Sequence, residues 1–245
     1  MRTSLLSLLL CAALAPTLTG CDEMLGHEKI KGNGNVVKQT RQTARFDQLE
    51  LKGNMDVYIR QGEQQEVVVE IDENIQPYII LEENEGELEI KQKDNTSLRT
   101  NRATKVYITV ADLRLISLSG SGNININGKF VAGDKLAFSL SGSGNIKSDE
   151  LDAPRIEADM AGSGDISLKG NTREVKVDIA GSADFHGTDL LAENAEVNIA
   201  GSGDAHVYAS MRVTASIAGS GDVRYRGDAI ATTSSVVGSG SLRKE

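Results

Sequence analysis

A three-residue motif, Gly-Ser-Gly, recurs through the second half of this 245-residue chain and limits the folds that are open to it. In the fourth of its seven copies, alanine replaces the third residue, giving Gly181-Ser182-Ala183. The first glycines lie 18 to 22 residues apart, at Gly120, Gly142, Gly162, Gly181, Gly201, Gly219 and Gly238. A fixed period near 20 residues is the signature of a solenoid, in which each repeat forms one coil and packs on its neighbours.

Apolar and polar residues alternate on both sides of each motif. The residue two positions before the first glycine is apolar in all seven copies: Leu118, Leu140, Met160, Ile179, Ile199, Ile217 and Val236. Since successive side chains of a strand point to opposite faces, this pattern predicts one strand before each corner and another after it. A single coil buries too few side chains to fold alone, so the coils must stack about 4.8 Å apart. The last coil, with Ser234 at a core position, has the weaker interior expected of an end.

The two glycines of the motif have different tolerances. The first is glycine in every copy, whereas the third position accepts Ala183. We infer that the first glycine needs a backbone angle that other residues avoid, and that the third position needs a small side chain. The first glycines are therefore predicted to be structural corners, with the regular coils covering residues 106–245.

The N-terminal half has the same strand periodicity without the motif. Alternating apolar residues predict strands within 46–59, 67–71, 78–90 and 106–118, with a turn at Gly53-Asn54. Residues 92–104 are polar and are predicted to form a loop. The predicted fold is therefore all-β: a β-solenoid of roughly 20-residue coils with a less regular β N-terminal portion.

The run from Phe46 to Glu70 resembles the start of a known family. Its Gly-x-x-Asp-Val-x-Ile stretch, Gly53 to Ile59, followed by Gln61-Gly62, is similar to the head GIN domain, the putative auto-transporter adhesin family. The Gly-Ser-Gly-Asn/Asp corners resemble the rest of that domain, which would cover residues 42–245. The resemblance implies a right-handed β-helix in an envelope or surface protein and carries over no catalytic residue.

The N-terminus indicates export and lipid anchoring. Arg2 and an apolar run from Leu5 to Ala15 are typical of a signal peptide, predicted over residues 1–20. Leu18-Thr19-Gly20-Cys21 resembles the lipobox of bacterial lipoproteins, which implies cleavage before Cys21 and a lipid such as palmitate on its thiol. Residues 21–41 would then be a lipid-anchored tether to a membrane of the bacterial cell envelope. Whether this is the outer or the inner membrane stays open.

Net charge and cysteine content exclude several classes of partner and chemistry. The formal net charge is −9 without a basic cluster, which argues against nucleic acid as a partner. Of the two cysteines, Cys11 lies in the predicted signal peptide and Cys21 would be acylated, so no thiol remains for a disulfide, a metal or a nucleophile.

Two columns of side chains beside the corners are candidates for a metal site. Stacked coils would place His186 over His206 and Asp184 over Asp204, about 5 Å apart, where two imidazoles and two carboxylates could hold zinc. Calcium could instead bridge the carboxylates of Asp165, Asp184, Asp204 and Asp222. The alternative is a solvated outer ladder of turn-forming aspartates and incidental histidines, which needs no cofactor.

The regular polar faces favour a non-enzymatic binding or adhesion module, anchored by lipid, with a polysaccharide or an envelope protein as its partner. One alternative is a β-helix enzyme acting on polysaccharide, although the coils vary little in length and no tryptophan is present to stack on a sugar. Another is a structural or envelope-stress component with a protein partner.

Overall fold

The computed structural model describes residues 28–245, with side chains throughout except at 231–234. The predicted signal peptide, residues 1–20, and the predicted lipid-attachment residue Cys21 lie outside this range. The described chain is all-β apart from one short 3-10 helix, η2 (Gln76–Tyr78). Within the described residues, no helix has the length and apolar character needed to cross a membrane.

The strands divide into an N-terminal set and a solenoid set. The N-terminal strands are β1 (Glu28–Lys31), β2 (Val36–Arg41), β3 (Gln48–Gly53), β4 (Asp56–Gln61), β5 (Glu66–Asp72), β6 (Ile79–Asn84), β7 (Glu87–Gln92), β8 (Thr96–Arg99) and β9 (Lys105–Val110). The solenoid strands are β10 (Leu115–Gly120), β11 (Asn123–Val131), β12 (Lys135–Gly142), β13 (Asn145–Gly162), β14 (Asp165–Ser167), β15 (Gly170–Gly181), β16 (Asp184–Gly201), β17 (Ala205–Gly219), β18 (Asp222–Arg226), β19 (Ile230–Gly238) and β20 (Ser241–Lys244).

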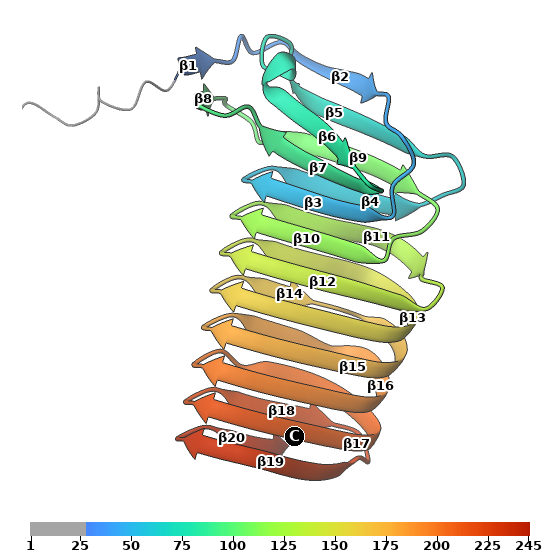
Figure 1. The fold of residues 1–245 in the computed structure, drawn as a ribbon, viewed down its shortest axis with the longest axis vertical. Helices are drawn as coiled ribbons and strands as arrows, with labels where there is room; N and C mark the ends of the chain where they lie inside the picture. The colour runs from blue at the N-terminus through green and yellow to red at the C-terminus, as the bar shows by residue number, and fades with distance from the viewer. Residues whose placement is uncertain (1–27) are drawn as a thin grey trace, which may run out of the picture.

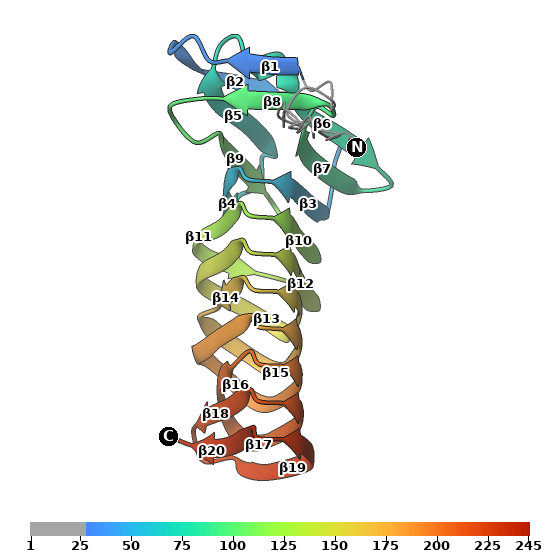
Figure 2. The same ribbon diagram turned by 90° about the vertical axis from the view of Figure 1, so that its left-hand side faces the viewer.

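The coils stack as the period predicts, and Figures 1 and 2 show them as a ladder below the N-terminal strands. Strands that precede a corner pair in parallel with one another, as β10 does with β12 and β12 with β13. Strands that follow a corner do the same, as β11 does with β13 and β18 with β20. We call these two surfaces the pre-corner sheet and the post-corner sheet. Each corner glycine lies in register with the next, from Gly120 over Gly142 to Gly219 over Gly238.

The predicted roles of the two corner glycines are confirmed. All seven first glycines have positive φ, between 113° and 144°. The third position has no such angle, but a Cβ on Gly144 would come 2.3 Å from the carbonyl oxygen of Gly122 in the coil above. The third residue is therefore limited by how closely the coils approach.

An eighth corner precedes the Gly-Ser-Gly series. Gly53 has φ 113° and lies in register with Gly120, because β3 pairs with β10 and β4 pairs with β11. The turn predicted at Gly53-Asn54 is thus the first corner of the solenoid. This corner has the sequence Gly-Asn-Met in place of Gly-Ser-Gly, so the motif does not identify it, although Leu51 occupies the apolar position two residues before the glycine.

The coil above this first corner is formed later in the sequence. β7 pairs with β3 and β9 pairs with β4, so the chain places β3 and β4 between strands that follow them. Residues 93–104 take the place of a corner and include β8, which pairs with β1. β5 and β2 then extend the post-corner sheet as antiparallel strands, while β6 extends the pre-corner sheet.

Two predictions for the N-terminal half are corrected. Residues 28–41 are not part of a tether, because β1 pairs with β8 and β2 pairs with β5 along its whole length. Residues 92–104 are not simply a loop, since β8 lies within them. Both segments are polar, and no apolar side chain of β1, β2 or β8 is fully buried, which is why apolar alternation did not reveal them.

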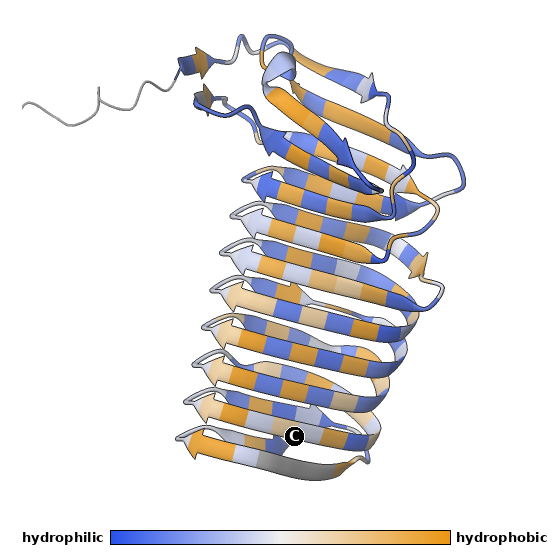
Figure 3. Ribbon diagram, viewed as in Figure 1, coloured by the Kyte–Doolittle hydropathy of each residue, from blue (hydrophilic) through white to orange (hydrophobic). Residues whose placement is uncertain are grey.

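The core is a column of aliphatic side chains enclosed by the coils. Inward residues such as Leu51, Ile116 and Val197 are fully buried, and the alternation appears in Figure 3 as stripes across the strands. Phe130, Phe138 and Phe185 are the largest of these buried side chains. In the last coil Val236 remains 40% exposed, because no further coil covers it.

Candidate functional site

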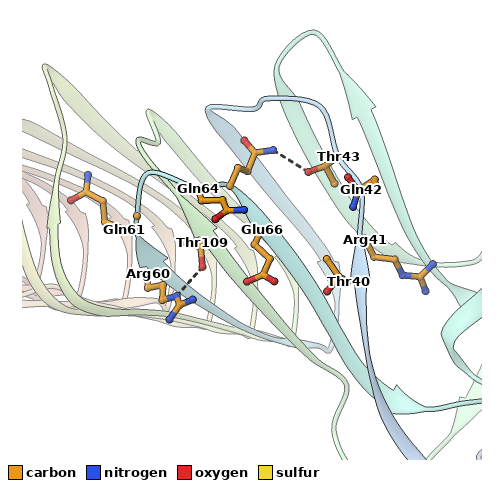
Figure 4. A pocket seen from close by; sticks show the side chains of 11 residues that line it. Thr40, Arg41, Gln42, Thr43, Arg60, Gln61, Gln64, Glu66 and Thr109 are labelled. Carbon is orange, nitrogen blue, oxygen red and sulfur yellow. Dashed lines mark hydrogen bonds between the residues drawn. The ribbon is translucent and has the colours of Figure 1, made fainter.

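A polar cleft lies in the N-terminal portion, where the end of β2 meets the connection between β4 and β5 (Figure 4). Its volume is about 540 Å³. Amide side chains dominate its lining, from Gln42, Gln61, Gln64 and Gln65. The antiparallel pairing of β2 with β5 positions one wall, and the turn after β4 positions the other.

Hydroxyl groups, two arginines, Glu66 and Gly62 complete the lining of the cleft. Arg60 Nε donates to Thr109 Oγ1 at 2.8 Å, and Gln65 Nε2 donates to Thr43 Oγ1 at 3.0 Å. The Arg41 side chain donates to the Gln76 carbonyl at 2.7 Å, which fixes its position. The cleft therefore offers amide, hydroxyl and guanidinium groups, several of which hydrogen bonds already orient.

Two stacked tyrosines lie beside the cleft. Tyr58 on β4 and Tyr107 on β9 are in register, with ring centroids 5.4 Å apart and an interplanar angle of 19°. A second, smaller depression contains both rings and shares Arg60, Glu66 and Thr109 with the polar cleft. The cleft and the rings thus form one continuous surface, which we call the head site.

The two rings differ in what covers them. Tyr107 has Tyr58 on one side, and Lys38 Nζ lies 4.9 Å from its ring centroid on the side of β5 and β2. The other side of Tyr58 points toward β11, where its register neighbour is the short side chain of Asn125. Tyr58 therefore presents a ring face that no other aromatic or cationic group of the described chain covers.

Charges near Tyr107 hold that ring in place. Its hydroxyl donates to Glu70 Oε2 at 2.9 Å, and Lys38 Nζ lies 3.3 Å from the same oxygen. Burial and the Glu70 carboxylate raise the pKa of Tyr107, so the hydroxyl stays a donor. Burial alone would raise the pKa of Glu70, but hydrogen bonds from Tyr107 and Lys38 outweigh it and the pKa is lowered.

A row of asparagines continues the head site onto β11. Asn123, Asn125 and Asn127 alternate with the buried Ile124 and Ile126, so all three amides lie on the outer face. Asn123 Nδ2 donates to Asp56 Oδ1 at 2.8 Å, and Asn145 Nδ2 donates to Asn123 Oδ1 at 3.0 Å. The amides of Asn125 and Asn127 lie beyond this chain of hydrogen bonds, next to Tyr58.

The aspartate column lies in register as predicted, and most of it has a structural role. The backbone N–H of Asp204 donates to Asp184 Oδ1 at 2.8 Å, and that of Asp222 donates to Asp204 Oδ1 at 2.8 Å. Ser241 donates its N–H and its hydroxyl to Asp222 Oδ1. Each of these carboxylates therefore ties one coil to the next.

The predicted histidine column also forms. His186 lies over His206, with ring centroids 6.1 Å apart. The four candidate ligands do not converge equally, because His206 Nδ1 lies 3.4 Å from Glu245 Oε1 at the end of the chain. A tighter group consists of Asp165, Asp184 and His186, whose ligand atoms lie within 4.8 Å of one another.

The pre-corner sheet carries a shallow groove with a floor of small residues. Ala161, Ala180 and Ala200 line it, with Asp159 and Asp178 at its edge. Burial and the neighbouring Asp178 carboxylate raise the pKa of Asp159. Burial opposes ionisation of Asp178 as well, but hydrogen bonds from Lys176 and Asn198 lower its pKa. The pair is a point of charge repulsion in a row whose other members, Ser139, Asn198 and Ser216, are uncharged.

Stacked parallel coils with a core of aliphatic residues, and no helix longer than one turn within residues 28–245, define this chain as a β-solenoid. The family model described as "Putative auto-transporter adhesin, head GIN domain" matches residues 45–229, and the chain belongs to this family. None of the curated proteins matches the sequence.

Several solved structures share the fold. A putative adhesin from Bacteroides fragilis NCTC 9343 has a TM-score of 0.82 at 20% identity, covering 88% of this chain and 100% of that one. A putative lipid binding protein and a putative adhesin, both from Parabacteroides distasonis ATCC 8503, have TM-scores of 0.70 and 0.71 at 29% and 26% identity. Each covers 89% of this chain and 100% of its own. The family and these neighbours are named for adhesion or lipid binding, which is compatible with a binding module at the cell surface or envelope.

The head site was not predicted from the sequence. The alternation around Val57 and Val106 places Tyr58 and Tyr107 on the outer face of their strands, but it does not say that those strands are neighbours. That pairing follows from the insertion of β3 and β4 beneath β7 and β9, and a single sequence carries no local sign of it.

Proposed function

We propose that this protein is a lipid-anchored, non-enzymatic binding module of the bacterial cell envelope, and that its head site binds polysaccharide. The observation that carries the proposal is the half-buried ring of Tyr58, whose face toward β11 meets no aromatic or cationic group of the described residues and is flanked by the amides of β11 and by the polar cleft. An aromatic face packs against the C–H groups of a sugar ring, while amides and hydroxyls match the sugar hydroxyl groups.

The lining chemistry favours a sugar over a hydrophobic protein segment. Protein interfaces centre on apolar or aromatic anchors that become fully desolvated. The cleft instead presents four glutamines, several threonines and the exposed guanidinium of Arg60. If the head site binds none of the polysaccharides tested, an envelope protein becomes the alternative partner.

Polysaccharide cleavage is the alternative activity, and the geometry of the head site does not favour it. Glu66 is the one carboxylate in the lining of the polar cleft, whereas glycoside hydrolysis uses a pair of carboxylates flanking the bond. Incubation with uronic-acid polymers and with neutral glucans should give no new reducing ends or unsaturated products. Product formation that is lost in Glu66→Gln would replace the binding proposal with an enzymatic one.

Binding itself can be measured by affinity electrophoresis in gels that contain neutral glucans, galactans or uronic-acid polymers. We expect at least one polymer to retard the protein, Tyr58→Ala to abolish the retardation, and Tyr58→Phe to keep it. Tyr78→Ala is the matched control, because Tyr78 is a half-buried tyrosine of the same N-terminal portion, like Tyr58, but lies outside the head site. Equal retardation of the Tyr58→Ala and Tyr78→Ala variants would refute the site.

The lipid anchor is a separate part of the proposal and rests on the lipobox resemblance at Cys21. Metabolic labelling with palmitate should mark the natural protein and leave Cys21→Ser unlabelled in the soluble fraction. Label on the Cys21→Ser variant would contradict an anchor at this residue.

A further inference from the structure

Three potential metal ligands gather on two successive coils of the post-corner sheet. Asp165 is the first residue of β14, and it lies in register with Asp184 on β16. His186 follows two residues after Asp184 on the same outward face, opposite Ser167. One ligand atom from each of Asp165, Asp184 and His186 lies within 4.8 Å of the other two.

The carboxylate of Asp165 differs from those below it in the column. Asp184, Asp204 and Asp222 each use Oδ1 to accept the backbone N–H of the following coil. Among the described residues, no hydrogen bond or ion pair reaches the Asp165 carboxylate. The break in the pattern falls at the one corner where alanine, Ala183, replaces the third glycine. Asp165 thus keeps both oxygens available, and Asp184 keeps Oδ2.

The same residue types recur one coil lower without gathering. Asp184, Asp204 and His206 occupy equivalent positions, but His206 lies beside Glu245 and both aspartates accept backbone N–H groups through Oδ1. Within the described residues, only the upper triplet brings three such ligand atoms together. The arrangement at Asp165 is therefore more than the consequence of the repeat.

We propose that Asp165, Asp184 and His186 bind one divalent transition-metal ion, with zinc as the natural occupant. One imidazole nitrogen and two carboxylate oxygens form a donor set that suits zinc, and three protein ligands leave its fourth position open to water. Bonds of about 2.0–2.2 Å place two ligands of one zinc ion about 3–4 Å apart, so small side-chain rotations close the site. Calcium prefers six to eight oxygen ligands, and this triplet does not supply them.

The bound ion would join two coils at the position where the hydrogen-bonded aspartate column is interrupted. It lies three to four coils, or roughly 15–20 Å, from Tyr58 along the post-corner sheet. The metal site is therefore independent of sugar binding at the head site. Failure of either proposal leaves the other unaffected.

Isothermal titration of the tag-free protein with zinc chloride tests the site. We expect one zinc ion per chain, at least ten-fold weaker binding in His186→Gln and in Asp165→Asn, and a change of less than two-fold in His206→Gln. The His206 variant is the matched control, since it removes the same side chain from the next coil. Zinc should also bind at least a hundred-fold more tightly than calcium.

Three results would overturn the proposal. One is the absence of zinc binding, and another is an equal loss of affinity in His186→Gln and His206→Gln. The third is zinc binding that survives in His186→Gln, which would assign the ion to other residues. Circular dichroism of each variant confirms that the coils are intact, so a loss of binding cannot be mistaken for unfolding.

Discussion

Two corner glycines allow two costs of adding a side chain to be measured separately: the strain of a positive φ angle and the steric clash with the neighbouring coil. Gly142 and Gly53 have similar angles, φ 124° and 113°. A Cβ on Gly142 would lie 2.4 Å from the carbonyl oxygen of Gly120, whereas a Cβ on Gly53 would meet nothing within 4 Å. The difference arises because the chain leaves the coil above Gly53 after Gln92 and forms no corner there. Alanine at the two positions therefore measures different costs.

The expected magnitudes follow from these contacts. Placing alanine at positive φ costs about 1–2 kcal/mol, and this applies to both variants. In Gly142→Ala the new methyl group must also move about 1 Å from the Gly120 carbonyl to reach normal contact. That oxygen accepts the N–H groups of Ser143 and Gly144 at 2.9 and 3.0 Å. Loss of both hydrogen bonds adds about 2 kcal/mol, at about 1 kcal/mol each.

Urea unfolding at 25 °C, followed by far-ultraviolet circular dichroism, measures the two free energies of unfolding. We expect Gly53→Ala to lose about 1–2 kcal/mol and Gly142→Ala to lose about 3–4 kcal/mol. The lower entropy of the unfolded alanine chain affects both variants alike and cancels in the comparison. Equal losses would refute the role assigned to coil contact, and a loss below 1 kcal/mol in both would refute the role of the angle.

Two further predictions concern pH. Asp159 has a raised pKa in the folded state, so its ionised form destabilises the fold, and this penalty is present above that pKa and absent below about 3.8. Asp159→Asn should therefore stabilise the protein at pH 7 by a few tenths of a kcal/mol and have no such effect at pH 3. A lower free energy of unfolding in this variant at pH 7 would contradict the repulsion from Asp178. The pKa of Asp222 is lowered in the folded state, chiefly by its hydrogen bond from Ser241. The ionised carboxylate therefore stabilises the fold above the pKa of the unfolded chain, and this stabilisation is lost as the pH falls through the pKa of the folded state. Urea unfolding of Asp222→Ala should show a loss of about 1 kcal/mol in the free energy of unfolding at pH 7, and this loss should shrink on acidification. Asp222→Asn should largely retain stability. Equal losses in the two variants would show that the hydrogen bonds accepted by Asp222 Oδ1 do not account for the effect.

The solenoid could be predicted because its requirements are local. The repeat of first glycines, the apolar residue two positions earlier and the small third residue are each visible within one coil. Registers such as Ile199 beside Ile217 follow from aligning the repeats on the glycine. The corner angle and the close approach of neighbouring backbones then explain why these positions accept so few residue types.

The N-terminal portion could be predicted only in part because its strands pair out of sequence order. Apolar alternation located β3, β4, β5, β6, β7 and β9 but gave no partner for any of them. β2 was missed because it lies at the edge of the sheet and buries none of its side chains fully. The first corner at Gly53 was missed because asparagine and methionine follow the glycine in place of serine and glycine.

The features of the candidate sites that follow the repeat could be predicted from the sequence, and the others could not. The columns of Asp184 over Asp204 and His186 over His206 were predicted because they follow the repeat. The participation of Asp165 depends on which carboxylates accept a backbone N–H, and the pairing of Tyr58 with Tyr107 depends on the inserted coil. Neither can be derived from the period of the motif.

Hydrogen–deuterium exchange in the presence of a bound polysaccharide tests the proposed head site most directly. We expect added protection in residues 56–61, 105–110 and 123–127, which carry Tyr58, Tyr107 and the β11 amides. The corners and lower coils, residues 160–245, should exchange at the same rate with and without the polymer. Protection confined to the lower coils, with unchanged exchange around Tyr58, would contradict the assignment of binding to the head site.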